Sequence, residues 1–483
     1  MRYTSTRDER IDVSSAQAIL EGLAPDGGLF FPSTLPRFDA KTFTILNYQD
    51  LAREILAPWF SDFTLEELDA CIREAYTGRF ESEEVVTTKK VGDRYIVELF
   101  HGPTAAFKDV ALSLFPRMLV KAREKMKLDK DLVILAATSG DTGSAALTGL
   151  KDLPHIGIIT FFPEIGISEI QRLQMTTQNG KNQKVASIEG NFDDAQNAVK
   201  RFLSAREEDP KILYSSANSI NIGRLLPQIV YYVHAYNTLV ARGEISMGEM
   251  IDVSVPTGNF GNILAGYLAK SCGLPLRHLF CASNSNHVLT DFFHTGIYDR
   301  NRDFETTLSP SMDILISSNL ERLLWSMSDG DSPLIRRLMD DLKSDGRFVV
   351  PESLRLKLQE TFKAGYADDQ ATLDTIRSVY QSRQYLLDPH TAVAWKVAEE
   401  NPSSVKCLVM ATASPFKFPQ SIAKAMHWPI EADLDSIQTM SNTTGIPIPA
   451  SLAALHSLPI LHHDLIDPNQ LDNYVRSVIK EIL

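Results

Sequence analysis

A lysine in apolar surroundings is the first residue of this sequence that suggests chemistry. Lys108 follows the motif HGPTAAF, and the apolar stretch VALSLF begins two residues later. Burial lowers the pKa of a lysine, and a neutral amine can attack a carbonyl group to form a Schiff base. Most lysines are solvated surface charges. The small and apolar neighbours of Lys108 instead favour a buried, reactive amine.

Three junctions between a predicted strand and a predicted helix offer sites for a small anion. They lie at residues 138–143 (TSGDTG), 257–262 (TGNFGN) and 411–415 (ATASP). A glycine-rich turn lets the backbone approach an anion, and the following helix points free N–H groups and its positive dipole end at it. Neither glycine turn matches the dinucleotide fingerprint or a nucleotide P-loop. The two turns therefore favour small anions, the alternative being ordinary connecting loops.

The elements that must hold these residues alternate between strand and helix. The short apolar run at 131–137 predicts a strand buried on both faces. Further strands are expected at 156–163, 251–256 and 276–283, and helix-like stretches of small or amphipathic residues follow the first three of these four segments. This alternation is typical of parallel sheets covered by helices. Residues 299–315 are polar and contain proline, so we expect a long surface loop there.

Length and charge limit the class of protein. At roughly 150 residues per domain, 483 residues predict about three domains or two large ones. The 61 acidic residues exceed the 48 Lys and Arg by 13, which argues against a nucleic-acid binder. Four scattered cysteines, no apolar signal segment and no apolar run of about 20 residues predict a cytoplasmic protein with no membrane partner.

Ordered motifs along the chain carry a family resemblance. HGPTAAFKD, TSGDTGSA, NSINIGR, GNFGN and TASPFKF occur in that order, with STR at 5–7, GLAPDGGL at 22–29 and DPHTAV at 388–393. Together they resemble the threonine synthase family of fold-type II pyridoxal 5'-phosphate (PLP) enzymes. The resemblance implies a lyase of threonine biosynthesis that converts O-phospho-L-homoserine and water to L-threonine and phosphate.

The resemblance also implies an architecture. We expect a tryptophan synthase β-like fold, with two parallel-sheet α/β domains, the cofactor in the cleft between them and an N-terminal segment. The expected divisions are 1–95 for that segment, 96–225 for the domain with the lysine, and 226–483 for the domain with the cofactor phosphate loop. These divisions are approximate, and the domains are allowed to interleave.

The same resemblance gives each motif a role. Lys108 is expected to bind PLP covalently and to act in catalysis, and Thr412 to contact the pyridine nitrogen. The cofactor phosphate is expected at Gly258, Asn259, Phe260, Gly261 and Asn262. The substrate is expected at Thr138, Ser139, Gly140, Asp141 and Thr142, and its phosphate at Asn218, Ser219 and Arg224. No metal is expected.

Elementary chemistry agrees with two of these roles. A hydroxyl at the pyridine nitrogen moderates the electron sink, as suits elimination and replacement. An arginine fork grips phosphate with two hydrogen bonds, which a lysine cannot do. Ser414 stands where some family members have histidine, and the resemblance carries over Ser414 and Lys417 as residues beside the ring-nitrogen contact, with the role of Ser414 left open.

Several alternatives stay open. A PLP-dependent phospholyase or an amino-acid dehydratase on the same fold shares most of the motifs, and product identity separates them. A non-catalytic binding protein and a dinucleotide-dependent enzyme are disfavoured by the intact lysine and the missing fingerprint. The chain is compatible with a monomer or a homodimer. His101 is either catalytic or packed, and His462 and His463 are expected in a surface turn.

Overall fold

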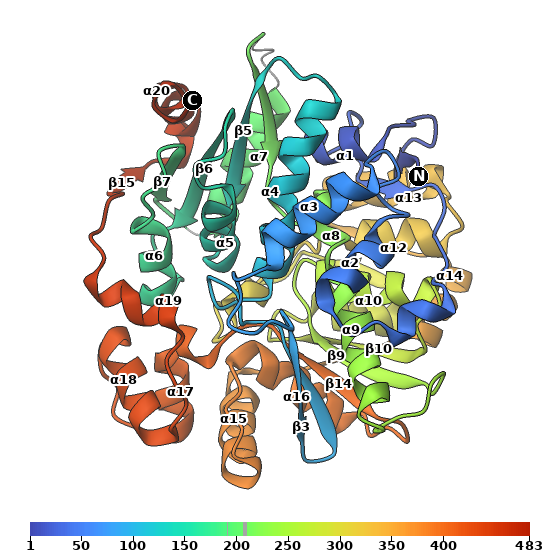
Figure 1. Cartoon of the computed structure of the whole chain (residues 1–483), viewed down its shortest axis with the longest axis vertical. Helices are drawn as coiled ribbons and strands as arrows, with labels where there is room; N and C mark the ends of the chain where they lie inside the picture. The colour runs from blue at the N-terminus through green and yellow to red at the C-terminus, as the bar shows by residue number, and fades with distance from the viewer. Residues whose placement is uncertain (191, 206–209) are drawn as a thin grey trace.

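Two sheets of mainly parallel strands dominate the fold (Figure 1). The computed structural model describes residues 1–190, 192–205 and 210–483. The larger sheet has the strand order β13 (Phe362–Tyr366), β10 (Leu276–Ser283), β9 (Ile251–Pro256), β14 (Cys407–Ala411), β4 (Arg94–Glu98) and β3 (Thr87–Val91). The smaller sheet has the order β15 (Asp464–Ile466), β7 (Gln183–Ile188), β6 (Ile156–Pro163), β5 (Asp131–Ala137) and β8 (Ile212–Ser216). Two antiparallel pairs complete the described strands: β1 (Tyr3–Ser5) with β2 (Phe30–Pro32), and β11 (Ile297–Asp299) with β12 (Arg347–Val349).

The predicted fold class is confirmed. The strands expected at 131–137, 156–163, 251–256 and 276–283 have those bounds, and each sits between parallel neighbours. One hairpin departs from the parallel pattern, because β3 pairs with β4 in antiparallel register.

Strand β5 illustrates why successive positions of a central strand are apolar. Leu132 and Ile134 belong to the main core, whereas Val133 and Leu135 belong to a second core on the opposite face of the same sheet. Successive side chains of a strand point to opposite faces. A strand covered on both faces therefore reads as a near-continuous apolar run.

The two sheets are not continuous in the chain. β3 and β4 come early in the sequence but lie at one edge of the larger sheet, whose other strands come from residues 251–411. β15 comes from the C-terminal tail and lies at one edge of the smaller sheet. The strands of the two sheets thus alternate along the chain, and the expected domains with divisions at 95 and 225 stay a prediction.

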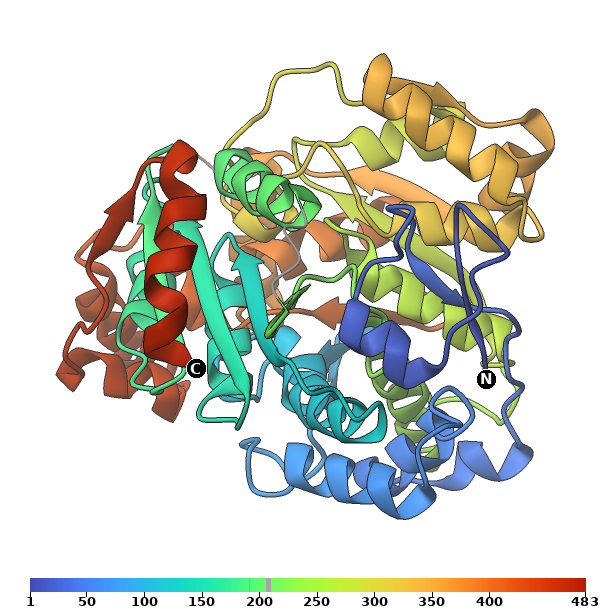
Figure 2. The same ribbon diagram turned by 90° about the horizontal axis from the view of Figure 1, so that it is seen from above.

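Helices cover both sheets and form the N-terminal layer (Figure 2). The helices of the first half are α1 (Ser15–Glu21), α2 (Tyr48–Leu56), α3 (Leu65–Tyr76), α4 (Lys108–Lys125), α5 (Asp141–Leu150), α6 (Glu169–Thr176), α7 (Phe192–Ala205), α8 (Ile222–Leu225) and α9 (Gln228–Ala241). Those of the second half are α10 (Gly261–Ser271), α11 (Val288–Thr295), α12 (Leu320–Met327), α13 (Ser332–Ser344), α14 (Glu352–Thr361), α15 (Asp369–Arg383), α16 (Pro389–Glu400), α17 (Pro419–Met426), α18 (Asp433–Thr444), α19 (Ala450–Ala453) and α20 (Leu471–Ile482).

The short 3-10 helices are η1 (Ala40–Thr44), η2 (Pro310–Met312), η3 (Pro415–Lys417), η4 (Ala454–Ser457) and η5 (Pro468–Gln470). η2 and η3 both contribute to the site described below.

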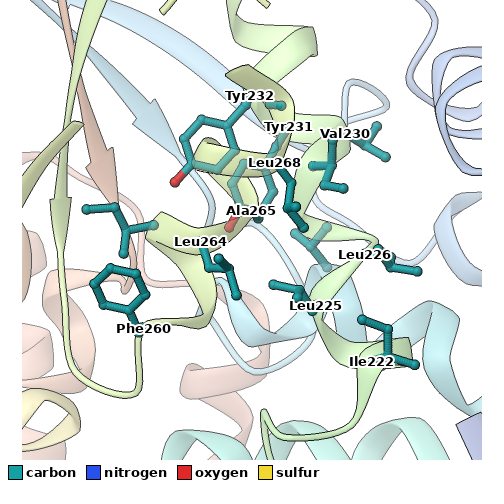
Figure 3. Packing of buried hydrophobic residues seen from close by; sticks show 14 of the residues in the cluster. Ile222, Leu225, Leu226, Val230, Tyr231, Tyr232, Phe260, Leu264, Ala265 and Leu268 are labelled. Atoms are coloured by element: carbon teal, nitrogen blue, oxygen red, sulfur yellow. The ribbon is translucent and has the colours of Figure 1, made fainter. Parts of the chain in front are cut away.

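The largest core lies between the sheets and the N-terminal helices. Helix α9 is buried from Gln228 to Leu239 and packs against α10, as the side chains of Tyr231, Leu264 and Leu268 illustrate (Figure 3). A helix that is apolar on every face belongs in such a core. α10 begins directly behind the second glycine turn, so the core fixes that turn. Within the described residues, no helix is long and apolar enough to cross a membrane.

Candidate active site

A pocket opens where loops from both sheets meet. Its lining includes residues that follow β5, β8, β9 and β14 together with the first residue of α4. Ligands of open α/β sheets bind beyond the carboxyl ends of parallel strands. The pocket lies beyond the carboxyl ends of strands from both sheets.

Lys108 is the first residue of α4 and lines the pocket with 9% of its surface exposed. The turn before it is tied to the end of β14: the Phe107 N–H donates to the Thr412 carbonyl at 2.8 Å, and the Ser414 N–H donates to the Ala105 carbonyl at 3.0 Å. Asp109 closes the turn, accepting hydrogen bonds from the Thr104 N–H at 2.8 Å and its hydroxyl at 2.6 Å. These hydrogen bonds fix the backbone segment that carries Lys108 in the pocket wall.

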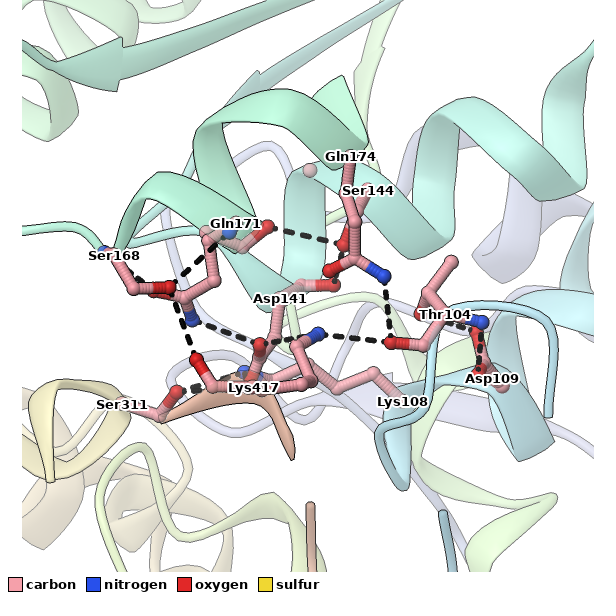
Figure 4. A network of polar contacts seen from close by, with 12 residues as sticks. Thr104, Lys108, Asp109, Asp141, Ser144, Ser168, Gln171, Gln174, Ser311 and Lys417 are labelled. Atoms are coloured by element: carbon pink, nitrogen blue, oxygen red, sulfur yellow. Dashed lines mark hydrogen bonds and ion pairs between the residues drawn. The ribbon is translucent and has the colours of Figure 1, made fainter. Parts of the chain in front are cut away.

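A buried charge network surrounds the amine of Lys108 (Figure 4). Its Nζ lies 3.3 Å from Asp141 Oδ2 and 3.3 Å from the hydroxyl of Ser311. The other oxygen of Asp141 lies 2.8 Å from Nζ of Lys417, whose side chain is fully buried, and accepts a hydrogen bond from Gln171 at 2.9 Å. Asp141 thus has a cation on each of its carboxylate oxygens.

The network sets the protonation of its members. Burial alone would raise the pKa of Asp141, but the two ammonium groups and the hydrogen bonds outweigh burial and hold that pKa well below its usual range. The pKa of Lys108 is lowered, chiefly by burial, and the charge of Lys417 lowers it further against the pull of Asp141. A lysine with a lowered pKa supplies a neutral amine more readily.

The opposite corner of the pocket is built from the start of α10. Phe260 precedes the helix in a left-handed conformation, with φ of +65°, and no side chain caps the first turn. A Cβ on Gly258 would come within 2.7 Å of the Ser311 carbonyl oxygen, so only glycine fits against η2. The hydroxyls of Tyr231 and Tyr232 lie 2.6 and 2.8 Å from Asn262 Oδ1 and fix its side chain. Uncapped N–H groups at a helix start are suited to an anion.

Arg224 brings a charge without an ion-pair partner among the described residues to the same pocket. It is 3% exposed, its Nη1 donates to the Ala217 carbonyl, and its Nε has no partner. No carboxylate of the described residues forms an ion pair with Arg224. Burial lowers the pKa of Arg224 to about 10. A buried cation without a counter-charge is costly, and an anionic ligand would offset that cost.

The pocket brings together most of the residues predicted from the sequence. Those that line it are Lys108, Thr138, Ser139, Thr142, Asn218, Ser219, Arg224, Gly258, Asn259, Phe260, Gly261, Asn262 and Thr412. Gly140 and Asp141 are not among the lining residues. Asp141 points instead into the charge network, and the hydroxyl of Thr138 accepts hydrogen bonds from the Gly140 and Gly143 N–H groups at 2.9 Å each. The roles of all these residues stay predictions.

Three residues of the site had no predicted role. Ser311 and His390 line the pocket, and Lys417 lies behind it. Ser311 belongs to the segment expected to be a surface loop, but Met312 and Asp313 beside it are only 3% and 6% exposed. That expectation is wrong for this end of the segment, because Asn284 and Thr307 satisfy the buried carboxylate of Asp313.

The comparisons with protein families cover most of the chain. Residues 2–76 match the family model described as "Threonine synthase N terminus", residues 88–409 match "Pyridoxal-phosphate dependent enzyme", and residues 391–465 match "Threonine synthase, C-terminal". The three matches follow one another along the chain.

Individual proteins are similar over nearly the same length. Threonine synthase of Pseudomonas aeruginosa is 39% identical over 431 residues, covering 88% of this chain and 90% of that protein. Threonine synthase-like 1 of Homo sapiens is 38% identical over 472 residues, which is 94% of this chain, but the chain spans only 62% of that relative's length. The crystal structure of PLP-bound threonine synthase from Brucella melitensis matches with a TM-score of 0.88 and 37% identity, covering 99% of both chains.

Proposed function

The chain belongs to the threonine synthase family of pyridoxal-phosphate dependent enzymes, and from this premise we propose that it converts O-phospho-L-homoserine and water into L-threonine and phosphate. The observation that carries the proposal is the unpaired, buried Arg224 in the same pocket as Lys108. A substrate that carries both an amine and a phosphate would place its amine near Lys108 and its phosphate at Arg224.

The residues present fit the PLP cofactor of the family. Lys108 offers a buried amine with a lowered pKa for the aldehyde, and the uncapped start of α10 with Gly258 offers a place for the phosphate. Thr412 lines the pocket and would present its hydroxyl to the ring nitrogen. When bound, PLP supplies an electron sink for charge that develops on the substrate carbons.

The other residues would bind and orient the substrate. Arg224, with Asn218 and Ser219, would hold the substrate phosphate, and its guanidinium would stabilise the negative charge that leaves with it. Ser139 and Thr142, at the start of α5, would hydrogen-bond the substrate carboxylate, since that end of a helix favours anions.

Lys108 would also move protons. The neutral Lys108 amine would serve as the base for the proton on the α carbon of the substrate. The carboxylate of Asp141 would then hold that amine in position, because Oδ2 of Asp141 and the Ser311 hydroxyl both lie 3.3 Å from Nζ.

We further propose that the enzyme works in the cytoplasm. The four cysteines are free and buried, which suits a reducing compartment. All residues used above line or adjoin one pocket of one chain. The proposal therefore holds for a monomer or a homodimer.

The test is turnover of O-phospho-L-homoserine by the PLP-loaded protein, with every product quantified. Equal amounts of threonine and phosphate support the proposal. Phosphate with a keto acid would mean a phospholyase, and absence of phosphate release would contradict the proposed substrate.

A further inference from the structure

Lys417 is a fully buried lysine that touches no solvent and does not line the pocket. Its Nζ lies 2.8 Å from Asp141 Oδ1 and 2.9 Å from the Thr104 carbonyl oxygen (Figure 4). These partners come from distant parts of the fold: Thr104 from the turn before Lys108, and Asp141 from the start of α5 in the smaller-sheet region. Lys417 itself ends η3, just after Thr412.

The geometry divides the carboxylate of Asp141 between two cations. Oδ1 accepts from Lys417 and Gln171, while Oδ2 accepts from Lys108 and the Ser311 hydroxyl. If Lys108 alone faced Asp141, the pair would favour a charged Lys108 strongly, because opposite charges at this distance stabilise each other. A second ammonium group on the same carboxylate reduces that effect.

The charged groups around Lys108 come from several elements. Asp141 lies on α5, Lys417 on η3 and Arg224 on α8, Asp109 follows Lys108 on α4, and His390 lines the pocket from α16. Asp141 is the acid that contacts Lys108, and Lys417 is the cation that contacts Asp141.

We propose that Lys417 is a positioning residue that acts through Asp141: it holds the carboxylate in place and keeps enough positive charge there for Lys108 to be neutral when it reacts. Lys417 makes no contact with the pocket and takes no proton in the reaction. This inference rests on the proposed function only in assigning the PLP aldehyde as the group that Lys108 attacks.

The proposal is tested by the pH dependence of PLP capture, which needs no substrate. Full-length protein freed of PLP is mixed with PLP across a pH series, the product on Lys108 is fixed with borohydride, and intact mass gives the rate. Capture accelerates as Lys108 loses its proton, so the midpoint follows the pKa of its amine. Lys417→Met should raise the midpoint by about one pH unit, the effect of losing one nearby like charge.

Matched variants separate this role from a purely structural one. Lys417→Arg keeps the charge and should keep the midpoint near that of the parent, and Asp141→Asn should lower it. Lys424→Met, an exposed lysine on the neighbouring α17, should change nothing. A midpoint for Lys417→Met equal to that of the parent would overturn the proposal, even if the variant were less stable.

A comparison of two further variants keeps the proposal testable if Lys417→Met does not fold. The double variant Lys417→Met/Asp141→Asn removes the ion pair as a unit, and its midpoint should lie above that of Asp141→Asn alone, because the charge of Lys417 is gone as well. Equal midpoints in the double variant and in Asp141→Asn would overturn the proposal. A parent that captures no PLP would instead contradict the proposed function itself.

Discussion

The buried charges around Lys108 and the buried charge of Arg224 lie in the same region of the fold but differ in whether they have ion-pair partners. Around Lys108, each cation has a carboxylate oxygen within 3.3 Å, and Asp141 has hydrogen bonds on both oxygens. Around Arg224, the charge is as deeply buried, yet its Nε has no partner and no described carboxylate pairs with it. The first corner is complete as it stands, and the second is complete only with an anion.

The difference shows which residues serve the structure and which serve a ligand. Taking a charge out of water costs several kcal/mol per ion unless a partner compensates. For Asp141 and Lys417, the ion pair between them compensates the free energy of desolvation within the protein. At Arg224 and the start of α10, the cost is met when phosphate groups bind. The predictions below test this contrast, beginning with the largest expected effect.

Lys108→Ala should abolish covalent PLP binding and lower turnover by at least about 10²–10⁴-fold, the usual contribution of a positioned acid–base group. Absorbance of bound PLP and intact mass after borohydride reduction check the first effect, and product assays the second. Retention of a borohydride-stable PLP adduct in this variant would show that another residue holds the cofactor. Lys424→Ala, on the surface of α17, is the control.

Lys417→Met should destabilise the ligand-free protein by about 3–5 kcal/mol, because it leaves the carboxylate of Asp141 buried with one cation fewer. Urea unfolding gives this free energy. The matched change in the other corner, Arg224→Met, should leave the free energy of unfolding unchanged or raise it, since it removes a buried charge that lacks a partner. Equal losses in the two variants would contradict the contrast.

Arg224→Ala should lower kcat/KM for O-phospho-L-homoserine by a factor that corresponds to roughly 2–5 kcal/mol of lost transition-state stabilisation, the cost of truncating one member of a buried charge pair. PLP content should stay that of the parent, and Arg224→Lys should restore little, because lysine lacks the two-pronged geometry. Steady-state kinetics and cofactor absorbance measure both. Turnover near the parent value would remove Arg224 from the substrate site.

Inorganic phosphate should stabilise the PLP-loaded protein through the same corner. At a hundredfold excess over its dissociation constant, one bound ligand adds about 2.7 kcal/mol to the free energy of unfolding. A thermal melt with and without phosphate detects this. Arg224→Met should lose the stabilisation while Lys417→Arg retains it, and a shift that survives in Arg224→Met would locate the anion elsewhere.

The smallest expected effect concerns a paired cluster at the end of β4. Burial opposes the charge of Glu98, but His101, Lys89, Thr87 and Tyr385 outweigh it and lower the pKa of Glu98 to about 2. Burial likewise opposes the charge of His101, while Glu98 and Glu81 raise its pKa above 6.5. The stabilisation from charged His101 is therefore complete below pH 6.5 and is lost as pH rises through the raised value.

His101→Gln should remove that part of the pH dependence. Urea unfolding on either side of pH 6.5 compares the two proteins: the parent should lose stability on the alkaline side, and the variant should lose less. The same loss in both would mean that His101 is not the group that titrates. His101 is not among the residues lining the pocket, so turnover should change little.

The sequence allowed much of this architecture to be predicted, for physical reasons that particular elements illustrate. β5 is a short run that is apolar from Leu132 to Ala137, as is typical of a strand buried on both faces. The glycine turns follow such strands directly, so the residues predicted for the site converge at the strand ends. The pairing of β15 with β7 was not predictable, because it depends on how the tail returns to the smaller sheet.

The residues of the site that had no predicted role carry no local signal in the sequence. Lys417 and Asp141 are far apart in the chain, and no local pattern reveals that one would bury its charge against the other. Residues around Ser311 look polar enough for a surface, since hydropathy does not register that Asp313 is satisfied by Asn284 and Thr307 inside the protein. His390 lies in the DPHTAV motif, which does not show by itself that the side chain lines the pocket. In the structure its Nδ1 lies 2.9 Å from Asp388 Oδ1.

The most direct test of the proposed reaction is turnover of O-phospho-L-homoserine in ¹⁸O-labelled water, followed by mass spectrometry of both products. Cleavage of the bond between the γ carbon and oxygen, with addition of water at the β carbon, predicts one ¹⁸O in threonine and none in the released phosphate. Label in the phosphate, together with homoserine as the other product, would mean that water attacks phosphorus and would contradict the account.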